Sequence, residues 1–338
     1  MHRRITNVMQ SRTARAAATL VLTGLCLTYI AWKIDLPRTG RVLAHANAAY
    51  FAGAVAIWLA TVWPLAWRWR RLLIAGGVDE RLGWLTRTYF VSYAAGQILP
   101  TSLGGDAARI YQGSRRHKHH SGAIVGSVLL ERALGGAATL ALAAIGFTLA
   151  VGRYEVGAYL WVELALVVFT VIGGFVIFSR SMRRPLARLA PVLRQLRVEQ
   201  PVRAVYDGIH AYRRHTTLLA SAFLLTLGVQ AMRVAGIWLI GRSVGVELSP
   251  RPYYVMGPML FLVMLVPFTI SGLAVREAFF VSFLAQLGVP PDRAFSTGFL
   301  FFALAMVVAL PGAGLVSLEA LKRWAVRADL RAVARSTK

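Results

Sequence analysis

Acidic residues and cysteine are both scarce in this sequence of 338 residues. Only 14 aspartates and glutamates stand against 38 lysines and arginines, and Cys26 is the single cysteine. One cysteine excludes a disulfide framework and a site built from several thiolates. Three histidines at 117–120 lie in a basic stretch with no cysteine or carboxylate beside them in the sequence, which favours a solvated patch over a metal site. We therefore expect no bound metal and no cofactor.

Charge of either sign is also rare, because only 15% of the residues are charged whereas 57% are apolar. Apolar runs about 20 residues long recur along the chain, as is typical of integral membrane proteins. Basic residues of such proteins gather in cytoplasmic loops and near anionic lipid headgroups. The basic excess therefore indicates membrane lipids, anionic or phosphate-bearing, as partners, and it does not indicate nucleic acid.

Unbroken apolar runs predict six transmembrane helices, each near the roughly 20 residues that cross a bilayer. They lie at about 14–32, 48–67, 129–151, 158–178, 216–240 and 294–316. Two further apolar regions, 83–114 and 253–288, are interrupted by proline and glycine, which leaves arms too short to cross. We expect these two regions to form re-entrant hairpins of broken helix. The predicted fold class is an all-α integral membrane protein.

The distribution of basic residues predicts the orientation in the membrane. With the N-terminus in the cytoplasm, 27 lysines and arginines fall in inside segments and seven fall in outside segments, as the positive-inside rule requires. The seven outside residues are Lys33, Arg38, Arg41, Arg153, Arg242, Arg251 and Arg293. Both termini are then expected in the cytoplasm.

We expect a single polytopic membrane domain over 1–330 and a short cytoplasmic tail over 331–338. Its first half spans about 14–151, and its second half spans about 158–320. The arginine-rich segment 180–214 is predicted to be a cytoplasmic linker that lies on the inner leaflet.

The two interrupted regions carry one motif twice. PTSLGGDAAR at 100–109 aligns without a gap on PFTISGLAVR at 267–276, with proline, glycine, alanine and arginine at the same four positions. Four identities in ten residues, at the break of both unusual regions, indicate an internal repeat. In the predicted topology the two hairpins enter from opposite faces, so the repeat is inverted, as it is in many carriers.

Each predicted break has a chemical consequence at membrane depth. Proline and glycine stop the helix, which frees backbone N–H groups and leaves the positive end of a half-helix. Such an end favours an anion. Thr101, Ser102 and Thr269 stand at the breaks, where a hydroxyl either binds a ligand or caps a helix, and capping alone would explain them.

Seven charged residues fall within the predicted membrane depth, where a charge is costly and marks function or a buried partner. They are Asp106, Arg109, Glu131, Arg132, Arg233, Arg276 and Glu277. Four positive charges against three negative ones leave one positive charge for a phosphate-bearing ligand to neutralise. Simpler readings exist for some of them, because Asp106 and Arg109 are three residues apart and would pair on a helix, and Arg132 would extend to the inner interface.

Three stretches resemble, in order and spacing, the signature blocks of the lysylphosphatidylglycerol synthetase transmembrane family. They are ILPTSLGGDAARIYQGSRR at 98–116, GSVLLERALGG at 126–136 and PFTISGLAVREAFFVSFLAQLGV at 267–289. That family includes the flippase half of the bacterial multiple peptide resistance factor and stand-alone flippase-like proteins, some encoded with hopanoid biosynthesis. The resemblance implies a lipid-handling protein of the bacterial cytoplasmic membrane. The motif positions it carries over are Pro100, Gly104, Gly105, Asp106, Arg109, Glu131, Arg132, Gly272, Arg276 and Glu277.

We therefore expect a flippase or transporter that moves a phospholipid or another polar-headgroup lipid across the membrane. The residues expected to bind this lipid are the ten motif positions together with Thr101, Ser102 and Arg233. One alternative is a non-transporting accessory or scaffold protein of an aminoacyl-lipid or hopanoid synthesis pathway, partnered by a synthesis enzyme or by a second copy of the chain. Another is a membrane-embedded lipid-modifying enzyme, which the scattered carboxylates support only weakly. Two-domain family members carry a soluble aminoacyltransferase after the membrane region, whereas about twenty residues follow the last predicted span here. Synthesis of an aminoacyl lipid is therefore not expected from this chain alone, and the favoured hypothesis is a protein that is not an enzyme.

Overall fold

The structure is a computed structural model, and every regular element within its described residues is a helix. The described residues are 35–98, 104–150, 215–264 and 274–336, together with the single positions 28, 161, 164, 168 and 212. The predicted spans at 14–32 and 158–178 and the predicted linker at 180–214 lie outside these four ranges.

Within the described ranges, four segments are long and apolar enough to cross a membrane. The helices that form them are α3 (Ala48–Ala60) joined at Thr61 to α4 (Val62–Ala75), α7 (Ser121–Ala150), α11 (Thr216–Ser243) and α14 (Pro291–Ser336). Each segment coincides with one of the predicted spans. In lipid such segments become helices because every backbone N–H and C=O must find its partner within the segment.

Each interrupted region contains one short helix before its break and one after it. The first pair is α5 (Leu82–Ile98) and α6 (Gly104–Arg116), and the second pair is α12 (Arg251–Val263) and α13 (Val275–Ala285). A helix of 17 residues, the longest of the four, is about 26 Å long, which is less than the roughly 30 Å of the hydrocarbon core. Each described helix of these two regions is therefore too short to cross by itself, and the re-entrant hairpins remain a prediction.

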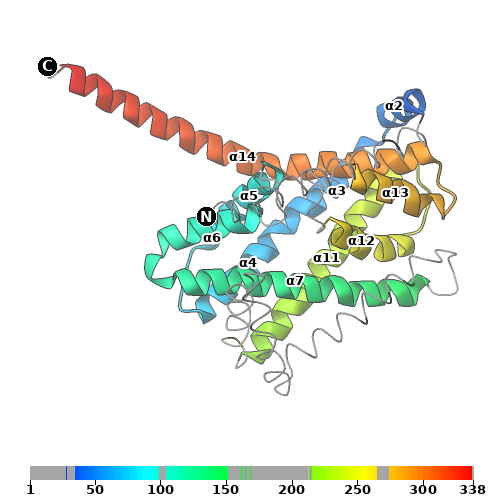
Figure 1. Cartoon of the computed structure of the whole chain (residues 1–338), viewed down its shortest axis with the longest axis horizontal. Coiled ribbons are helices and arrows are strands. Elements are labelled where there is room, and N and C mark those ends of the chain that lie inside the picture. The colour runs from blue at the N-terminus through cyan, green and yellow to red at the C-terminus, as the bar shows by residue number, and fades with distance from the viewer. Residues whose placement is uncertain are drawn as a thin grey trace, which may run out of the picture.

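The short helices lie between two long ones that run in opposite directions, α7 and α14 (Figure 1). Helix α5 packs against α14, and α12 packs against α7. The second member of each pair stays with its own half, because α6 packs against α7 and α13 packs against α14. The first short helix of each half thus covers the last long helix of the other half, and the two contacts are equivalent under the repeat.

Glycines permit both of these crossings. A Cβ atom on Gly146 of α7 would overlap the backbone carbonyl of Tyr254 in α12, and one on Gly312 of α14 would overlap the carbonyl of Phe90 in α5. Small residues allow such close backbone approach between helices in membranes. The equivalent packing of the two halves is therefore supported at the level of single residues.

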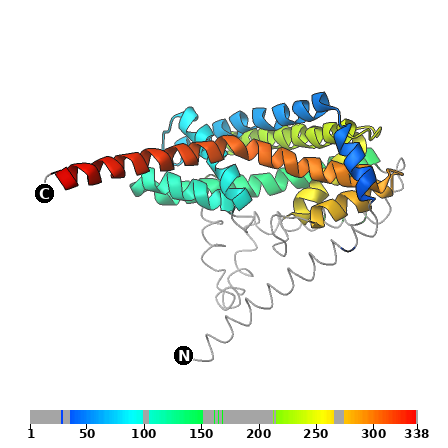
Figure 2. The same ribbon diagram turned by 90° about the horizontal axis from the view of Figure 1, so that it is seen from above.

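The remaining long helices form a second antiparallel pair, α3–α4 with α11, which lies beside α14 and α7 (Figure 2). Helix α2 (Leu36–Ala44) packs on α14 near the start of that helix. Two apolar clusters fill most of the described interior, and a small third one joins Leu72, Leu130 and Tyr212. One surrounds Trp69 and Leu85 in the first half, and a larger one surrounds Tyr253 and Phe280 in the second half.

Candidate functional site

A cavity of about 430 Å³ lies among α4, α5, α6, α7 and α11, a size within the usual range for small-molecule sites. Most of the residues that line it are polar. The polar residues that line it are Arg68, Tyr89, Ser92, Tyr93, Asp106, Arg109, Glu131, Arg132, Thr139, Thr226, Gln230 and Arg233. Four residues predicted to bind lipid from the first repeat and its following helix therefore meet here with Arg233 from the second half.

The carboxylate of Glu131 is the centre of this cavity wall, although its residue is only 3% exposed. It accepts hydrogen bonds from Arg68 Nη2 at 2.9 Å, from Arg109 Nη1 at 2.5 Å and from the Tyr89 hydroxyl at 2.8 Å. A buried charge is tolerated when it is paired and its remaining lone pairs are hydrogen-bonded. Glu131 on α7 thus binds side chains from α4, α5 and α6.

The guanidinium of Arg109 has a second carboxylate partner, Asp106, at 2.7 Å. This confirms the pairing that their spacing predicted, and Asp106 also pairs with Arg132. The Arg109 guanidinium further lies 4.4 Å from the ring of Tyr89 and 5.1 Å from that of Trp69, within cation–π distance. Its Nε is buried and has no hydrogen-bond partner within the described residues.

Arg68 was not predicted at this site, because the second span was predicted to end at residue 67, which leaves Arg68 in the following cytoplasmic segment. Helix α4 instead continues to Ala75, and Arg68 is buried within it. A signal was present in the sequence. Arg68 follows Leu65 by three residues and precedes Leu72 by four, so helical periodicity places it on the same face as these two apolar side chains.

Arg233 makes a different set of contacts. Its Nη2 donates to the hydroxyl of Tyr93 at 2.5 Å, its Nε donates to Thr61 Oγ1 at 3.3 Å, and the guanidinium lies 4.9 Å from the ring of Trp58. Within the part of the chain that the structure describes, no carboxylate is paired with it. Arg233 is therefore held by neutral groups beside a cavity.

The described lining of the cavity has an excess of positive charge. Four arginines stand against two carboxylates among the described lining residues, an excess of two positive charges. An excess of one positive charge was predicted from the sequence. The difference arises because Arg68 joins the cluster while Arg276 and Glu277 are absent from the described lining.

Arg276 and Glu277 lie instead at the start of α13 and bind each other. Arg276 Nε donates to Glu277 Oε1 at 3.0 Å, and the other carboxylate oxygen of Glu277 accepts the backbone N–H of Ala274 at 2.8 Å. That bond satisfies one of the free N–H groups at the helix start. Arg276 is 2% exposed, and its guanidinium lies 5.0 Å from the ring of Phe302. Contact of either residue with lipid remains a prediction.

The two predicted glycines of the first break start α6. Gly104 is buried, and a Cβ atom on Gly105 would lie 2.7 Å from the carbonyl oxygen of Ser92, so Gly105 allows α6 to pack closely on α5. The other predicted break residues lie outside the described ranges. They are Pro100, Thr101, Ser102, Thr269 and Gly272.

A smaller charged cluster lies outside the apolar spans, where the loop after α4 meets the end of α6. Glu80 Oε2 is 3.0 Å from His117 Nε2 and also pairs with Arg116. Burial alone would raise the pKa of the Glu80 carboxyl, but hydrogen bonds from Arg116, the Arg81 backbone and His117 together hold it below its ordinary value. The histidine stretch thus has a carboxylate neighbour that its local sequence did not reveal.

Comparison with known proteins assigns the chain to a family. Residues 16–312 match the family described as the lysylphosphatidylglycerol synthase TM region, and the cavity residues all fall within that match. The chain belongs to the lysylphosphatidylglycerol synthase TM region family. This membership, together with the four apolar segments, makes it a multi-pass membrane protein.

A relative of this family member is the glycosyltransferase AglD of Haloferax volcanii. The two sequences are 24% identical over 339 residues, a region that covers 89% of this chain and 54% of AglD. The chain therefore spans about half the length of this curated relative.

Proposed function

We propose that this protein is a lipid transporter that moves a phospholipid, or another lipid with a phosphate-bearing headgroup, through the cavity around Glu131. The observation that carries the proposal is Arg233, which lines the cavity and whose guanidinium has no carboxylate partner among the described residues. Excess charge at membrane depth is costly without a partner. An anionic headgroup would supply that partner and would leave again on the other side of the membrane.

Two groups are suited to contact such a headgroup. Arg233 presents a guanidinium that no described carboxylate neutralises, and Arg109 presents a buried Nε without a hydrogen-bond partner among the described residues. Guanidinium groups bind phosphate oxygens through strong, often bidentate, charge-assisted hydrogen bonds. The two carboxylates, by contrast, are held by arginines, an arrangement that favours binding over proton transfer.

The equivalent packing of the two halves supports movement of the lipid rather than static binding. Inverted repeats with broken helices build carriers in which one half rocks against the other around a central site. In this proposal the two pairs of short helices enter from opposite faces of the bacterial cytoplasmic membrane, with both chain termini in the cytoplasm.

The similarity to AglD favours a second candidate function. If the glycosyl transfer named for that relative belongs to the half that does not align, this chain would serve as an accessory protein of glycosyl transfer. The cavity would then hold a lipid without moving it. Transport and accessory binding differ in whether the protein alone moves lipid between leaflets.

A reconstitution experiment tests the proposal. Purified protein is placed in vesicles with fluorescent phosphatidylglycerol, and lipid movement is measured by quenching the label in the outer leaflet. Arg233→Gln should slow movement by about 10- to 100-fold, which corresponds to one charge-assisted hydrogen bond of about 1.5–3 kcal/mol. Arg233→Lys should recover only part of the rate, since an ammonium lacks the planar fork.

The control is Arg251→Gln, because Arg251 is an exposed arginine at the start of α12 and does not line the cavity. It should move lipid at the wild-type rate. Equal rates for Arg233→Gln and wild type would contradict the proposal. A wild-type protein that binds the lipid but moves none would favour the accessory function.

A further inference from the structure

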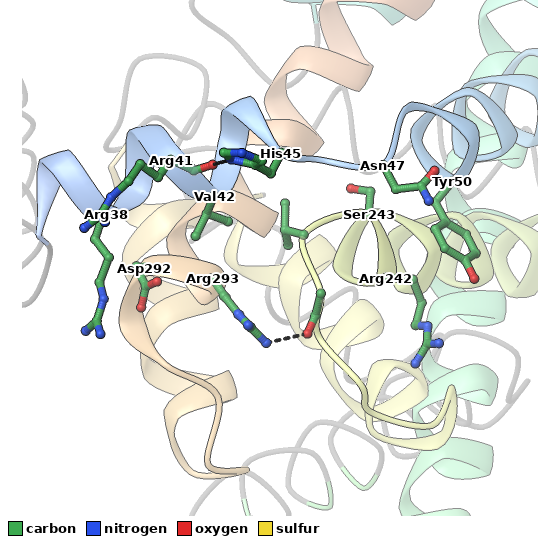
Figure 3. A pocket seen from close by; sticks show the side chains of 12 residues that line it. Arg38, Arg41, Val42, His45, Asn47, Tyr50, Arg242, Ser243, Asp292 and Arg293 are labelled. Atoms are coloured by element: carbon green, nitrogen blue, oxygen red, sulfur yellow. Dashed lines mark hydrogen bonds between the residues drawn. The ribbon is translucent and has the colours of Figure 1, made fainter.

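A second pocket, of about 620 Å³, lies where α2, the end of α11 and the start of α14 meet (Figure 3). We call it the arginine pocket, because four arginines line it. They are Arg38, Arg41, Arg242 and Arg293. None of these residues lines the cavity around Glu131, so the arginine pocket is a separate site.

The gathering of these arginines is unexpected from the charge distribution of the chain. Seven lysines and arginines fall in the segments that are predicted to lie on the outer side of the membrane. Four of those seven line this one pocket, although they come from positions more than 200 residues apart in the sequence. Where basic residues are few, their convergence on one concave surface points to a ligand of opposite charge.

The backbone around the arginine pocket is fixed by specific contacts. The N–H of Asn47 donates to the carbonyl of Ser243 at 2.8 Å, which holds the turn between α2 and α3 against the end of α11. Arg293 Nη1 donates to the carbonyl of Gly245 at 2.7 Å, and Gly245 has a φ of +79°, a conformation that glycine adopts readily. The pocket therefore joins elements of both halves.

The charges of the arginine pocket are largely uncompensated. Within the described residues none of its four arginines forms an ion pair, and Asp292 is the carboxylate in its lining. Three positive charges are thus in excess. Figure 3 shows the guanidinium groups of Arg38, Arg242 and Arg293 extending to the same side, with Tyr50 beside Arg242, whose guanidinium lies 6.0 Å from the Tyr50 ring.

We infer that the arginine pocket binds a phosphate group, carried either by the headgroup of an outer-leaflet lipid or by a soluble phosphate. The inference rests on the proposed function for its orientation and extends it, since a lipid moved through the central cavity would have a binding site at the outer end of its path. A phosphodiester with one negative charge is attracted by the excess of three, and a guanidinium is a strong hydrogen-bond donor to phosphate oxygens.

Binding to purified protein in a neutral detergent tests this inference by titration calorimetry. The probes are dioctanoyl phosphatidylglycerol, dioctanoyl phosphatidylcholine and inorganic phosphate. The variants are Arg38→Gln and Arg242→Gln, which leave the contact between Arg293 and Gly245 intact. The matched control is Arg251→Gln, which removes an exposed arginine predicted on the same side of the membrane but outside the pocket.

Each pocket variant should bind phosphatidylglycerol about tenfold more weakly, and Arg251→Gln should bind it as wild type does. Phosphatidylglycerol binding without competition from inorganic phosphate identifies a lipid headgroup, whereas equal competition identifies a soluble phosphate. Wild-type affinity in both pocket variants, an equal loss in Arg251→Gln, or equal binding of zwitterionic phosphatidylcholine would overturn the inference.

Arg233→Gln separates this inference from the proposed function. If that substitution slows lipid movement while the tenfold effect of Arg242→Gln persists in its background, both sites exist. If it removes all phosphatidylglycerol binding, the arginine pocket holds no lipid, and the transport proposal stands. If lipid movement is absent in the wild type but binding depends on Arg242, transport fails and the arginine pocket remains.

Discussion

Arg109 and Arg276 occupy equivalent positions of the repeat, yet their surroundings differ. Arg109 joins carboxylates from two helices, lies against two aromatic rings and lines a cavity. Arg276 binds the residue next to it, and that neighbour satisfies the start of α13. The predicted repeat thus places an arginine in each of two short helices, and the two arginines make different contacts.

The second half nevertheless contributes to the cavity through another element. Arg233 of α11 lies in the long helix before the second pair of short helices, as Arg68 of α4 lies before the first pair. Arg68 is bound by Glu131, whereas Arg233 has only neutral partners among the described residues. The site is therefore asymmetric, because Arg68 pairs with a carboxylate whereas Arg233 pairs with none among the described residues.

The largest effect is expected at Glu131, which distinguishes the Arg109 site from the Arg276 site. Glu131→Ala leaves two buried guanidinium groups without this carboxylate and should lower the free energy of unfolding by about 3–5 kcal/mol. The measurement is denaturant unfolding of the protein in detergent. Glu247→Ala, at an exposed carboxylate, should change it by less than about 0.5 kcal/mol. A wild-type midpoint for Glu131→Ala would mean that the carboxylate does not hold the four helices together.

A smaller effect is expected at Arg276, and it should appear in stability rather than in transport. Arg276→Ala removes a cation from the buried carboxylate of Glu277, which keeps the N–H of Ala274, so the loss should be about 2–3 kcal/mol. Lipid movement per folded molecule should remain near wild type, whereas Arg109→Ala should reduce it. An Arg276→Ala protein of normal stability that moves no lipid would restore the prediction that both repeat arginines contact the substrate.

The smallest effects are expected at the two glycine crossings, which test how alike the halves are. Gly146→Ala and Gly312→Ala each place a methyl group against a backbone carbonyl of the facing helix and should each cost about 1–3 kcal/mol. Gly136→Ala and Gly314→Ala have open space around the new methyl group and should be neutral or slightly stabilising, because alanine favours a helix. Thermal unfolding of the four variants measures the difference. Similar stability for all four would show that the crossings are not close.

The four spans that the structure describes were predictable because membrane-spanning helices follow from the length of apolar runs, and the short helices of the interrupted regions follow from where proline and glycine break those runs. The boundaries were less predictable. Helix α4 extends eight residues beyond the predicted end at 67. This extension was not predicted because Arg68 is buried through its contacts with Glu131 and Thr226, which come from other helices.

The pairing of Arg276 with Glu277 could not be expected from helical spacing. Side chains at i and i+1 point in different directions on a regular helix, so a pair between these two residues was not predicted. At the start of α13, Glu277 turns back to the N–H of Ala274, and the Arg276 side chain reaches the same carboxylate. Local geometry at a helix end, rather than the repeat pattern, determines what this arginine contacts.

The exchange of short helices between the halves has a consequence for how the chain is made. Helix α5 leaves the ribosome long before α14, its packing partner. At about 5–20 residues per second, synthesis of the intervening chain takes about 10–40 s. During that interval the first half has no final partner for α5, and α12 is already able to cover α7. Biogenesis is therefore complete only when the last long helix is inserted, and a nascent chain stopped before it would present the unpaired face of α5 to the quality-control machinery of the membrane.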